Sequence, residues 1–361
     1  MDKSSTKKLE RWVPIIAVFL GFILGAIIML VTGENPLILM KSIIRAVFGI
    51  NVDNIGTGKA VFSIRTLTAY FIYVMPIVLT GLSVAFAFRT GLFNIGAEGQ
   101  VLMGSMAAAV IGVLVDAPAI ILLPLVVLAG ALAGALWGFI AGYLKARFNV
   151  HEVVVTIMLN YTALYLVNYV QKQLPGSNSN ETVRLHEGAL LQSEFLKGLT
   201  KNTQAHWGFI LVILAIIIFS YIINKTTFGY ELKAVGYNPF AAQYAGMKVK
   251  RNAALSMAIA GAFSGLAGVI IVAGTFGKGR MLPSFENYGF DGIAVALIGG
   301  NTGLGSLFSG MLLAALKAAQ PIMDGQGVPN AIAVIISAAI IIFVATKTGL
   351  IDLIKKLRRA K

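Results

Sequence analysis

The segment GLFNIGAEGQ, residues 91–100, decides how this chain folds, because it places polar residues within a long apolar region. VMPIVLTGLSVAFAF (74–88) precedes it and VLMGSMAAAVIGVLV (101–115) follows. An acidic side chain in mid-bilayer costs roughly 2.5–3.5 kcal/mol on insertion scales. The glycines permit a broken or tightly packed helix, in which Glu98, with Asn94 one helical turn before it, can face the interior of a bundle.

The composition defines the class of protein. Hydrophobic residues make up 57% of the 361 residues and charged residues 12%, against about 25% charged residues in soluble domains. The longest polar connection, residues 172–206, is too short to form an ordinary domain. We expect an all-α polytopic membrane protein that forms one transmembrane domain over residues 1–361.

The composition and the motifs exclude several functions. The chain has no cysteine, its three histidines are scattered, and it contains no HExxH spacing, so neither a thiolate site nor a metal site is predicted. It has no GxxxxGK[ST] motif and no nucleophile–base constellation, so it is not predicted to be an enzyme or to hydrolyse ATP itself. The net charge of +14 is explained by basic residues beside membrane spans, not by nucleic-acid binding.

Apolar runs predict about ten spans, some broken or short. We expect the segment 290–318 to cross twice around a glycine-rich turn, GGNTGLG (299–305), because glycine and asparagine break helices. The first run follows a basic head and lacks a small-residue cleavage site, so it is predicted to be a retained span. Besides 290–318, the spanning runs lie near residues 13–32 (the first run), 68–88, 92–115, 119–144, 150–171, 207–224, 253–274 and 329–346.

The distribution of basic residues predicts the orientation. With a cytoplasmic N-terminus, the short inside segments hold 18 of the 29 lysines and arginines. Their excess indicates that both termini and the loop 225–252 are cytoplasmic, with the loop 172–206 outside. The basic tail 347–361 is inside only if 290–318 crosses twice.

Small residues and amphipathic spacing indicate how two elements pack. Residues 36–49 have the spacing of an amphipathic helix lying on the outer membrane surface. In the fourth span a stripe of glycines recurs every four residues, which lets another helix approach closely. A later span repeats the pattern with Gly261 and Gly265. The stripe of the fourth span consists of Gly130, Gly134, Gly138 and Gly142.

A polar stripe marks the fifth span, HEVVVTIMLNY (151–161). Glu152, Thr156 and Asn160 are spaced i, i+4 and i+8, and therefore share one helix face that must be turned to the bundle interior or to a water-filled path. These residues, with Asn94 and Glu98, are candidates for the lining of a translocation path. Alternatively, they link helices, cap a broken helix, or pair with a cation such as Arg89. For Glu152, near the cytoplasmic surface, we favour such a structural or coupling role.

The loop 225–252 contains a candidate docking helix. Asn238 can cap a helix whose first residue is Pro239. A short helix with aromatic anchors and small neighbours suits insertion into a groove on a partner, although an ordinary surface turn has a similar composition. The candidate residues are Asn238, Pro239, Phe240, Ala241, Ala242, Tyr244 and Gly246.

Four segments together resemble a known family. GLFNIGAEGQ, HEVVVTIMLNY, AVGYNPFAAQYAGM and ALIGGNTGLGSLFSG are similar to the permease subunits of ABC importers of the branched-chain amino acid and ribose type. Within that type, the resemblance is to the nucleoside and simple-sugar permeases that work with basic-membrane-protein lipoproteins, and it covers roughly residues 10–350. His151 stands where the family pattern has Asn.

The resemblance implies a function and a set of partners. The chain would carry nucleosides across a bacterial cell membrane, bind no cofactor itself, and pair with a second similar permease. A cytoplasmic ATPase would hold ATP and Mg²⁺ and dock on the coupling helix, while an extracytoplasmic lipoprotein would deliver substrate. Phe93 and Tyr161 would then be available to stack on a base.

Three other possibilities stay open at the level of sequence. The same machinery could carry simple sugars. An ion-coupled secondary transporter with Glu98 as the carrier would show inverted repeats, which are weak here. A channel would lack the docking loop.

Overall fold

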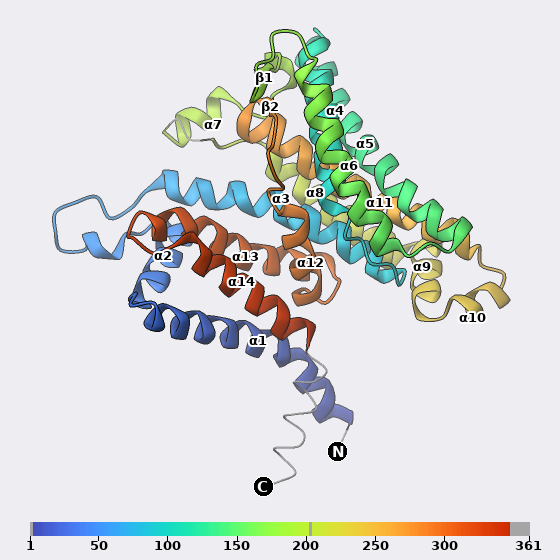
Figure 1. Cartoon of the computed structure of the whole chain (residues 1–361), viewed down its shortest axis with the longest axis horizontal. Helices are drawn as coiled ribbons and strands as arrows, with labels where there is room; N and C mark the ends of the chain where they lie inside the picture. The colour runs from blue at the N-terminus through green and yellow to red at the C-terminus, as the bar shows by residue number, and fades with distance from the viewer. Residues whose placement is uncertain (1–2, 202–203, 347–361) are drawn as a thin grey trace. The chain divides into compact units, whose positions relative to one another are not determined.

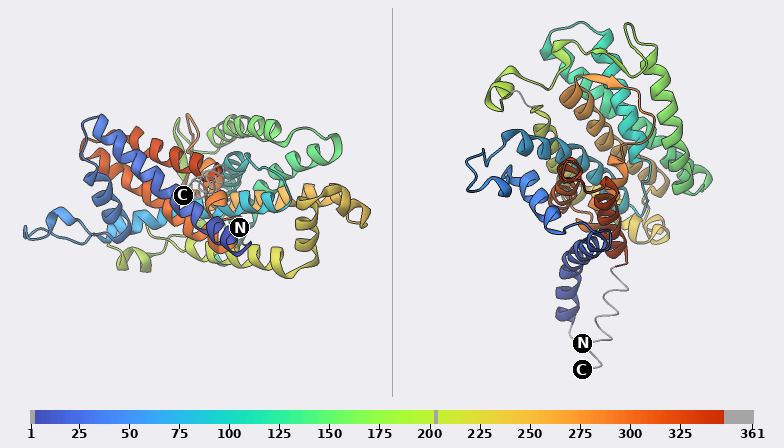
Figure 2. Two further views of the ribbon diagram at one scale, coloured as in Figure 1. Left: turned by 90° about the horizontal axis from the view of Figure 1, so that it is seen from below. Right: turned by 60° about the vertical axis from the view of Figure 1, so that its left-hand side comes forward.

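The computed structural model describes residues 3–201 and 204–346, and helices dominate it (Figure 1; two further views in Figure 2). The α-helices are α1 (Lys3–Val31), α2 (Leu37–Phe48), α3 (Ile64–Arg89), α4 (Ala97–Leu114), α5 (Ala119–Phe148), α6 (Glu152–Lys172), α7 (Glu194–Leu199), α8 (Gly208–Lys225), α9 (Thr227–Tyr237), α10 (Pro239–Tyr244), α11 (Val249–Val269), α12 (Tyr288–Ile298), α13 (Gly303–Asp324) and α14 (Asn330–Ala345). The basic tail 347–361, predicted to be cytoplasmic, lies outside the described residues.

The remaining regular elements are short. Strands β1 (Glu181–Arg184) and β2 (Lys278–Arg280) pair antiparallel. A π-helical segment, Ile270–Phe276, continues α11, and single 3-10 turns occur at Val52–Asn54 and Glu187–Ala189.

Seven of the described helices are long and apolar enough to cross a membrane: α3, α4, α5, α6, α8, α11 with its π-helical extension, and α13. Three further apolar helices, Ile16–Val31, Tyr288–Ile298 and Ala331–Phe343, are shorter. The chain is therefore a multi-pass membrane protein by its helices, but the predicted count of about ten spans is not confirmed.

The second half of the predicted double crossing is a full-length helix, whereas the first half is not. With 11 residues, α12 is about 16 Å long, roughly half the thickness of the hydrocarbon core. Gly299–Asn301 then turn the chain into α13, with Gly300 and Asn301 in the left-handed region (φ 61° and 55°). The glycine-rich turn lies where the sequence predicts it, but α12 is too short to cross by itself.

The run predicted to span from residue 92 starts five residues later as a helix. Residues 90–96 form a turn, and α4 begins at Ala97, so GLFNIGAEGQ is a helix break followed by a helix start. Gly91, at φ 74°, adopts a conformation that a residue with a side chain rarely takes.

Contacts divide the chain into two compact units, Met1–Tyr70 with Leu312–Lys361, and Phe71–Met311. In the first unit α1 packs along α14. A Cβ atom added to Gly21 would overlap the side chain of Ile340, and one added to Gly25 would overlap that of Ile336, so these glycines let the two helices approach closely. The predicted amphipathic segment 36–49 forms α2, which ends at Gly49 in the left-handed conformation.

The core of the second unit is a close contact between α5 and α11, with α4 against both (Figure 1). A Cβ atom on Gly134 would lie 2.3 Å from the carbonyl oxygen of Gly261, and one on Gly138 would lie 2.2 Å from that of Met257. Real Cβ atoms do not approach backbone this closely, so glycine is required at these positions. We call this contact between α5 and α11 the glycine seam.

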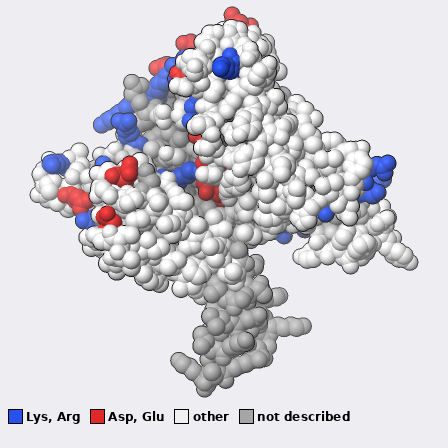
Figure 3. All heavy atoms as spheres, in the orientation of Figure 1, with Lys and Arg blue, Asp and Glu red and all other residues white. Residues whose placement is uncertain are grey.

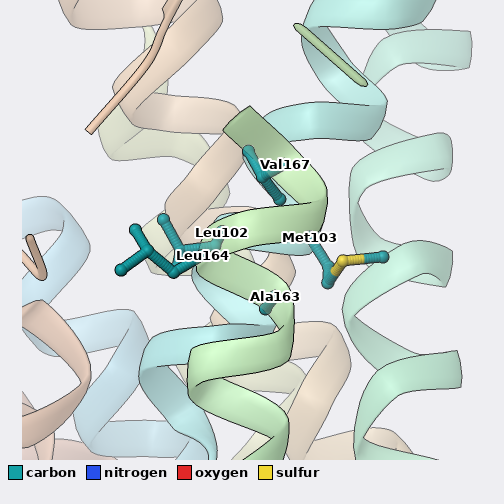
Figure 4. Close-up of a cluster of buried hydrophobic side chains, with 5 residues drawn as sticks. All are labelled: Leu102, Met103, Ala163, Leu164 and Val167. Atoms are coloured by element: carbon teal, nitrogen blue, oxygen red, sulfur yellow. The ribbon is translucent and has the colours of Figure 1, made fainter. Parts of the chain in front are cut away.

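Hydrophobic side chains hold α6 against α4. Figure 4 shows Leu102 and Met103 of α4 with Ala163, Leu164 and Val167 of α6, all buried. The surface over α5 and α6 is uncharged between their ends, and charged groups gather at the ends (Figure 3). This distribution is the one expected of helices that cross a bilayer.

Candidate functional site

Glu98, in the first turn of α4, caps the short helix α12. Its Oε1 accepts a hydrogen bond from the backbone N–H of Asn287 at 2.9 Å, and its Oε2 accepts one from Gly289 at 2.6 Å. The residue is 2% exposed. The first N–H groups of a helix lack partners within it and form the positive end of its dipole. A carboxylate at this position therefore satisfies the buried N–H of Gly289 and the partly buried N–H of Asn287, and these donors offset the cost of burying the charge.

Gly289 permits this contact. A Cβ atom added to it would lie 2.2 Å from the backbone nitrogen of Glu98. On the other side of the helix start, Thr80 of α3 donates its hydroxyl to the carbonyl of Tyr288 at 2.8 Å. The start of α12 is thus fixed by α3 and α4 together.

Asn94 lies in the turn before α4 and pairs with Gln100. The amide nitrogen of Asn94 donates to Oε1 of Gln100 at 2.9 Å, and the amide nitrogen of Gln100 donates back to Oδ1 of Asn94 at 3.0 Å. Asn94 also donates to the hydroxyl of Ser83 on α3 at 3.1 Å. All three residues are buried. These bonds close the turn and attach it to the preceding helix.

Asn160 of α6 serves both sides of the same break. Its Oδ1 accepts from the backbone N–H of Gly99 at 2.8 Å, and its Nδ2 donates to the carbonyl of Ile95 at 3.0 Å. Thr156 packs against Gly96 and donates its hydroxyl to the carbonyl of Glu152 at 2.8 Å. Two members of the predicted polar stripe of α6, Thr156 and Asn160, thus lie over the break, which we call the α4 break (residues 90–100).

Other predicted residues lie apart from these contacts. Glu152, at the start of α6, forms an ion pair with Lys145 at the end of α5, with 3.0 Å between nitrogen and oxygen. Phe93 stacks on Phe88, with ring centroids 5.1 Å apart. Tyr161 is half-exposed.

The predicted docking helix is present as α10. Oδ1 of Asn238 accepts from the N–H groups of Phe240 and Ala241, and Pro239 is the first helical residue. Gly246 follows the helix at φ 83°. Phe240 is 81% and Tyr244 98% exposed, whereas Ala242 is buried, so α10 holds its aromatic side chains away from its own chain.

The helix before α10, α9, connects α10 to the α4 break. A Cβ atom on Gly236 of α9 would lie 2.4 Å from the carbonyl oxygen of Arg89. Gly91 is also packed against the backbone of Gly236. Arg89 in turn donates to the carbonyl of Asn301 at 2.8 Å. The end of α9, the end of α3 and the turn before α13 are therefore in direct contact.

The loop 172–206 covers the end of α11. The N–H of Leu191 donates to the carbonyl of Ala273 at 2.9 Å, and the side chain of Gln192 donates to that of Gly274 at 2.8 Å, so the loop binds carbonyls of the π-helical segment. His206 is buried against Gly208 and Gly274, and burial lowers its pKa from 6.5 to about 4. The imidazole is therefore neutral at pH 7.

Sequence reasoning missed Thr80 and Ser83 of α3, and three further participants. Gln100 lies two residues after Glu98, within GLFNIGAEGQ, so its amide was a usable signal. Asn287 and Gly289, at the start of α12, lie about 190 residues from Glu98, and nothing local marks them. In the described ranges, no group of three or more His, Asp or Glu side chains could hold a metal ion.

Comparison with known proteins gives one family. Residues 66–345 match the family described as branched-chain amino acid transport system / permease component. The chain is 46% identical to the guanosine ABC transporter permease protein NupP of Bacillus subtilis (strain 168), over 96% of each chain.

Two further relatives are similar over most of their length. The nucleoside ABC transporter permease protein NupB of Lactococcus lactis subsp. cremoris is 37% identical over 93% of this chain and 90% of its own. The glucose ABC transporter permease protein TsgB13 of Haloferax volcanii is 33% identical over 83% of each. No solved structure matches the chain.

Proposed function

This chain belongs to the branched-chain amino acid transport system permease family, and we propose that it is the permease subunit of an ATP-driven ABC importer for nucleosides. The observation that carries the proposal is its similarity, over nearly its whole length, to two permeases named for guanosine and nucleosides. In this role the chain is a conduit that performs no covalent chemistry. ATP and Mg²⁺ would bind to a separate ATPase subunit.

The α4 break would shape the translocation path. Asn94, Glu98 and Asn160 hydrogen-bond to backbone or to one another, and Thr156 packs against Gly96. Their role is therefore to hold a turn and a half-length helix in place, with contact to the substrate left to other groups. Phe93 and Tyr161 are candidates to stack on the aromatic base of a nucleoside.

The helix α10 would be the coupling helix. Its exposed Phe240 and Tyr244 supply apolar surface for a groove on the ATPase. Because α9 touches the end of α3, a displacement of α10 has a direct route to the α4 break and from there, through Glu98, to α12. This route gives nucleotide-driven closure of the ATPases a means to change the path from outward-facing to inward-facing.

The remaining partners follow from the family and the exposed helix surfaces. In the most apolar windows of α5 and α8, only 22% and 28% of residues are buried within the chain, so lipid or another membrane protein must cover the rest. We expect a second, similar permease subunit there, with an extracytoplasmic lipoprotein delivering the substrate. Both termini would be cytoplasmic and the membrane would be that of a bacterial cell.

Uptake of radiolabelled guanosine tests the proposal. Cells that express the chain with its partner subunits should accumulate guanosine, and should continue when the proton gradient is collapsed while ATP is maintained. Loss of uptake under that condition would favour an ion-coupled transporter. Uptake of radiolabelled glucose is the second arm, because one relative is named as a glucose permease; uptake of glucose and not of guanosine would make the substrate a simple sugar.

A further inference from the structure

A pocket outside the α4 break lies between the end of α5 and the start of α11. Its volume is about 310 Å³. Phe139, Tyr143 and Ala146 of α5 line it on one side. The rings of Phe139 and Tyr143 stack with centroids 5.8 Å apart. Phe139 is 37% exposed and Tyr143 is 46% exposed. The wall is therefore apolar and aromatic, and it opens to the surroundings of the bundle.

Three basic side chains complete the lining: Arg147 of α5, and Lys250 and Arg251 of α11. All three are exposed. No carboxylate of the described residues forms an ion pair with them, and the acidic groups of neighbouring elements are engaged elsewhere. Glu152 pairs with Lys145, and Glu231 accepts a hydrogen bond from Asn252. The pocket thus combines an apolar wall with unpaired positive charge.

We propose that this pocket binds an anionic phospholipid, with the acyl chain along Phe139 and Tyr143 and the phosphate between Arg147, Lys250 and Arg251. The inference rests on the membrane location in the proposed function. Aromatic rings at the end of a span lie at the depth of the headgroups, and clustered lysine and arginine residues between spans attract anionic lipids. A protein partner would have to supply both an apolar group and an acidic group at this depth, whereas every anionic lipid carries both.

Native mass spectrometry of the full chain with its partner subunits measures this binding. The complex should retain phosphatidylglycerol in preference to phosphatidylcholine. The triple variant R147Q/K250Q/R251Q should bind phosphatidylglycerol at least tenfold more weakly, since three basic side chains beside an anionic headgroup are together worth roughly a hundredfold. The matched control K172Q/K225Q/K233Q loses the same charge outside the pocket, and should keep the wild-type preference.

A second variant separates the apolar wall from the charge. Ala146→Trp fills the pocket without changing any charge, and should also weaken phosphatidylglycerol binding, while millimolar inorganic phosphate should not displace the lipid. The proposal is overturned by equal binding of the two lipids, by equal losses in the two triple variants, or by displacement with phosphate. It is also overturned if the chain binds lipid alone but not in the complex, because a protein then occupies the pocket. These readouts do not depend on uptake, so they stand or fall separately from the transport proposal.

Discussion

The glycine seam and the α4 break hold neighbouring helices by opposite means. In the seam, α5 and α11 touch because side chains are missing: the space beside Gly134 is filled by the backbone of Gly261. In the break, the chain is held because side chains are present: Glu98, Asn94 and Asn160 each satisfy backbone or amide groups that would otherwise be buried without partners. The glycine seam should therefore tolerate no added side chain, and the α4 break should tolerate no loss of a polar side chain. Five experiments test that difference.

The largest effect should come from adding a side chain to the seam. Gly134→Leu would place a Cβ atom 2.3 Å from a carbonyl oxygen, so α5 and α11 must separate. We expect no folded protein in the membrane, as measured by size-exclusion chromatography of a fluorescent fusion. Gly198→Leu is the control, because nothing lies within 4 Å of that position. Normal folding of the Gly134 variant would show that the seam is not required.

Removing the carboxylate of the break should have the next largest effect. Glu98→Leu removes the acceptor of both N–H groups and leaves that of Gly289 buried without a partner, at a cost of about 1–3 kcal/mol, while the partly exposed N–H of Asn287 adds less. Uptake should be lost. Glu98→Gln keeps one acceptor oxygen and should be milder, as measured by thermal unfolding and guanosine uptake. Equal and complete loss in both variants would instead indicate that the charge itself is required.

The amide pair tests whether the break acts as a unit. Asn94→Ala and Gln100→Ala each leave a buried amide without its partner, and each should cost about 1–3 kcal/mol. The double variant should cost clearly less than the sum of the two, because the second substitution removes a group that has already lost its partner. A double-mutant cycle on the unfolding midpoint gives this coupling. Additive losses would show that the two residues act independently.

His206 combines close packing against glycine with a side-chain hydrogen bond. Its imidazole ring fills the space beside Gly208 and Gly274, and its Nδ1 accepts from the backbone N–H of Gly208. Its pKa is lowered to about 4 in the folded chain, so the unfolded state binds the proton more tightly. Stability is complete above pH 6.5 and is lost as the pH falls toward 4, by about 2 kcal/mol at pH 5. His206→Gln should reduce this pH dependence in thermal unfolding between pH 7 and 5. An unchanged profile would rule out His206 as its source.

The smallest effect on folding should come from α10, where the aromatic side chains have no place in the core. Tyr244→Ala removes a side chain that is 98% exposed, so stability should change by less than about 0.5 kcal/mol. Under the proposed function, uptake should fall while the protein folds normally. Nucleoside uptake and ATPase activity of the assembled complex measure the coupling. Wild-type values of both would contradict the coupling assignment.

Most helices could be predicted from the sequence because long apolar runs and i, i+4 spacing are local signals. The positions of the glycine stripe and of the cap at Asn238 could be read in the same way. The length of α12 could not be predicted, since its start is set by Glu98 and Thr80, which lie on other helices. The turn before α4 was obscured by Leu92 and Phe93, which continue the apolar run although the chain is no longer helical there.

The chemistry of Glu98 was only partly readable. The cost of burying the acid indicated a polar partner, and capping of a broken helix was one of the alternatives. The identity of the helix that is capped depends on tertiary contacts between distant segments. The donors are backbone N–H groups, which every residue except proline carries, so no residue type announces them.

The hydrogen bonds that Asn160 and Glu98 accept from backbone N–H groups allow motion at the α4 break to be measured by hydrogen exchange. The amide protons of Gly99, Asn287 and Gly289 are each held by a side chain from another helix or connecting segment. They exchange with deuterium only when the hydrogen bond to that side chain breaks, even if the surrounding helices stay intact. Their exchange rates in the resting and nucleotide-driven complex would therefore report how often the break opens in each turnover.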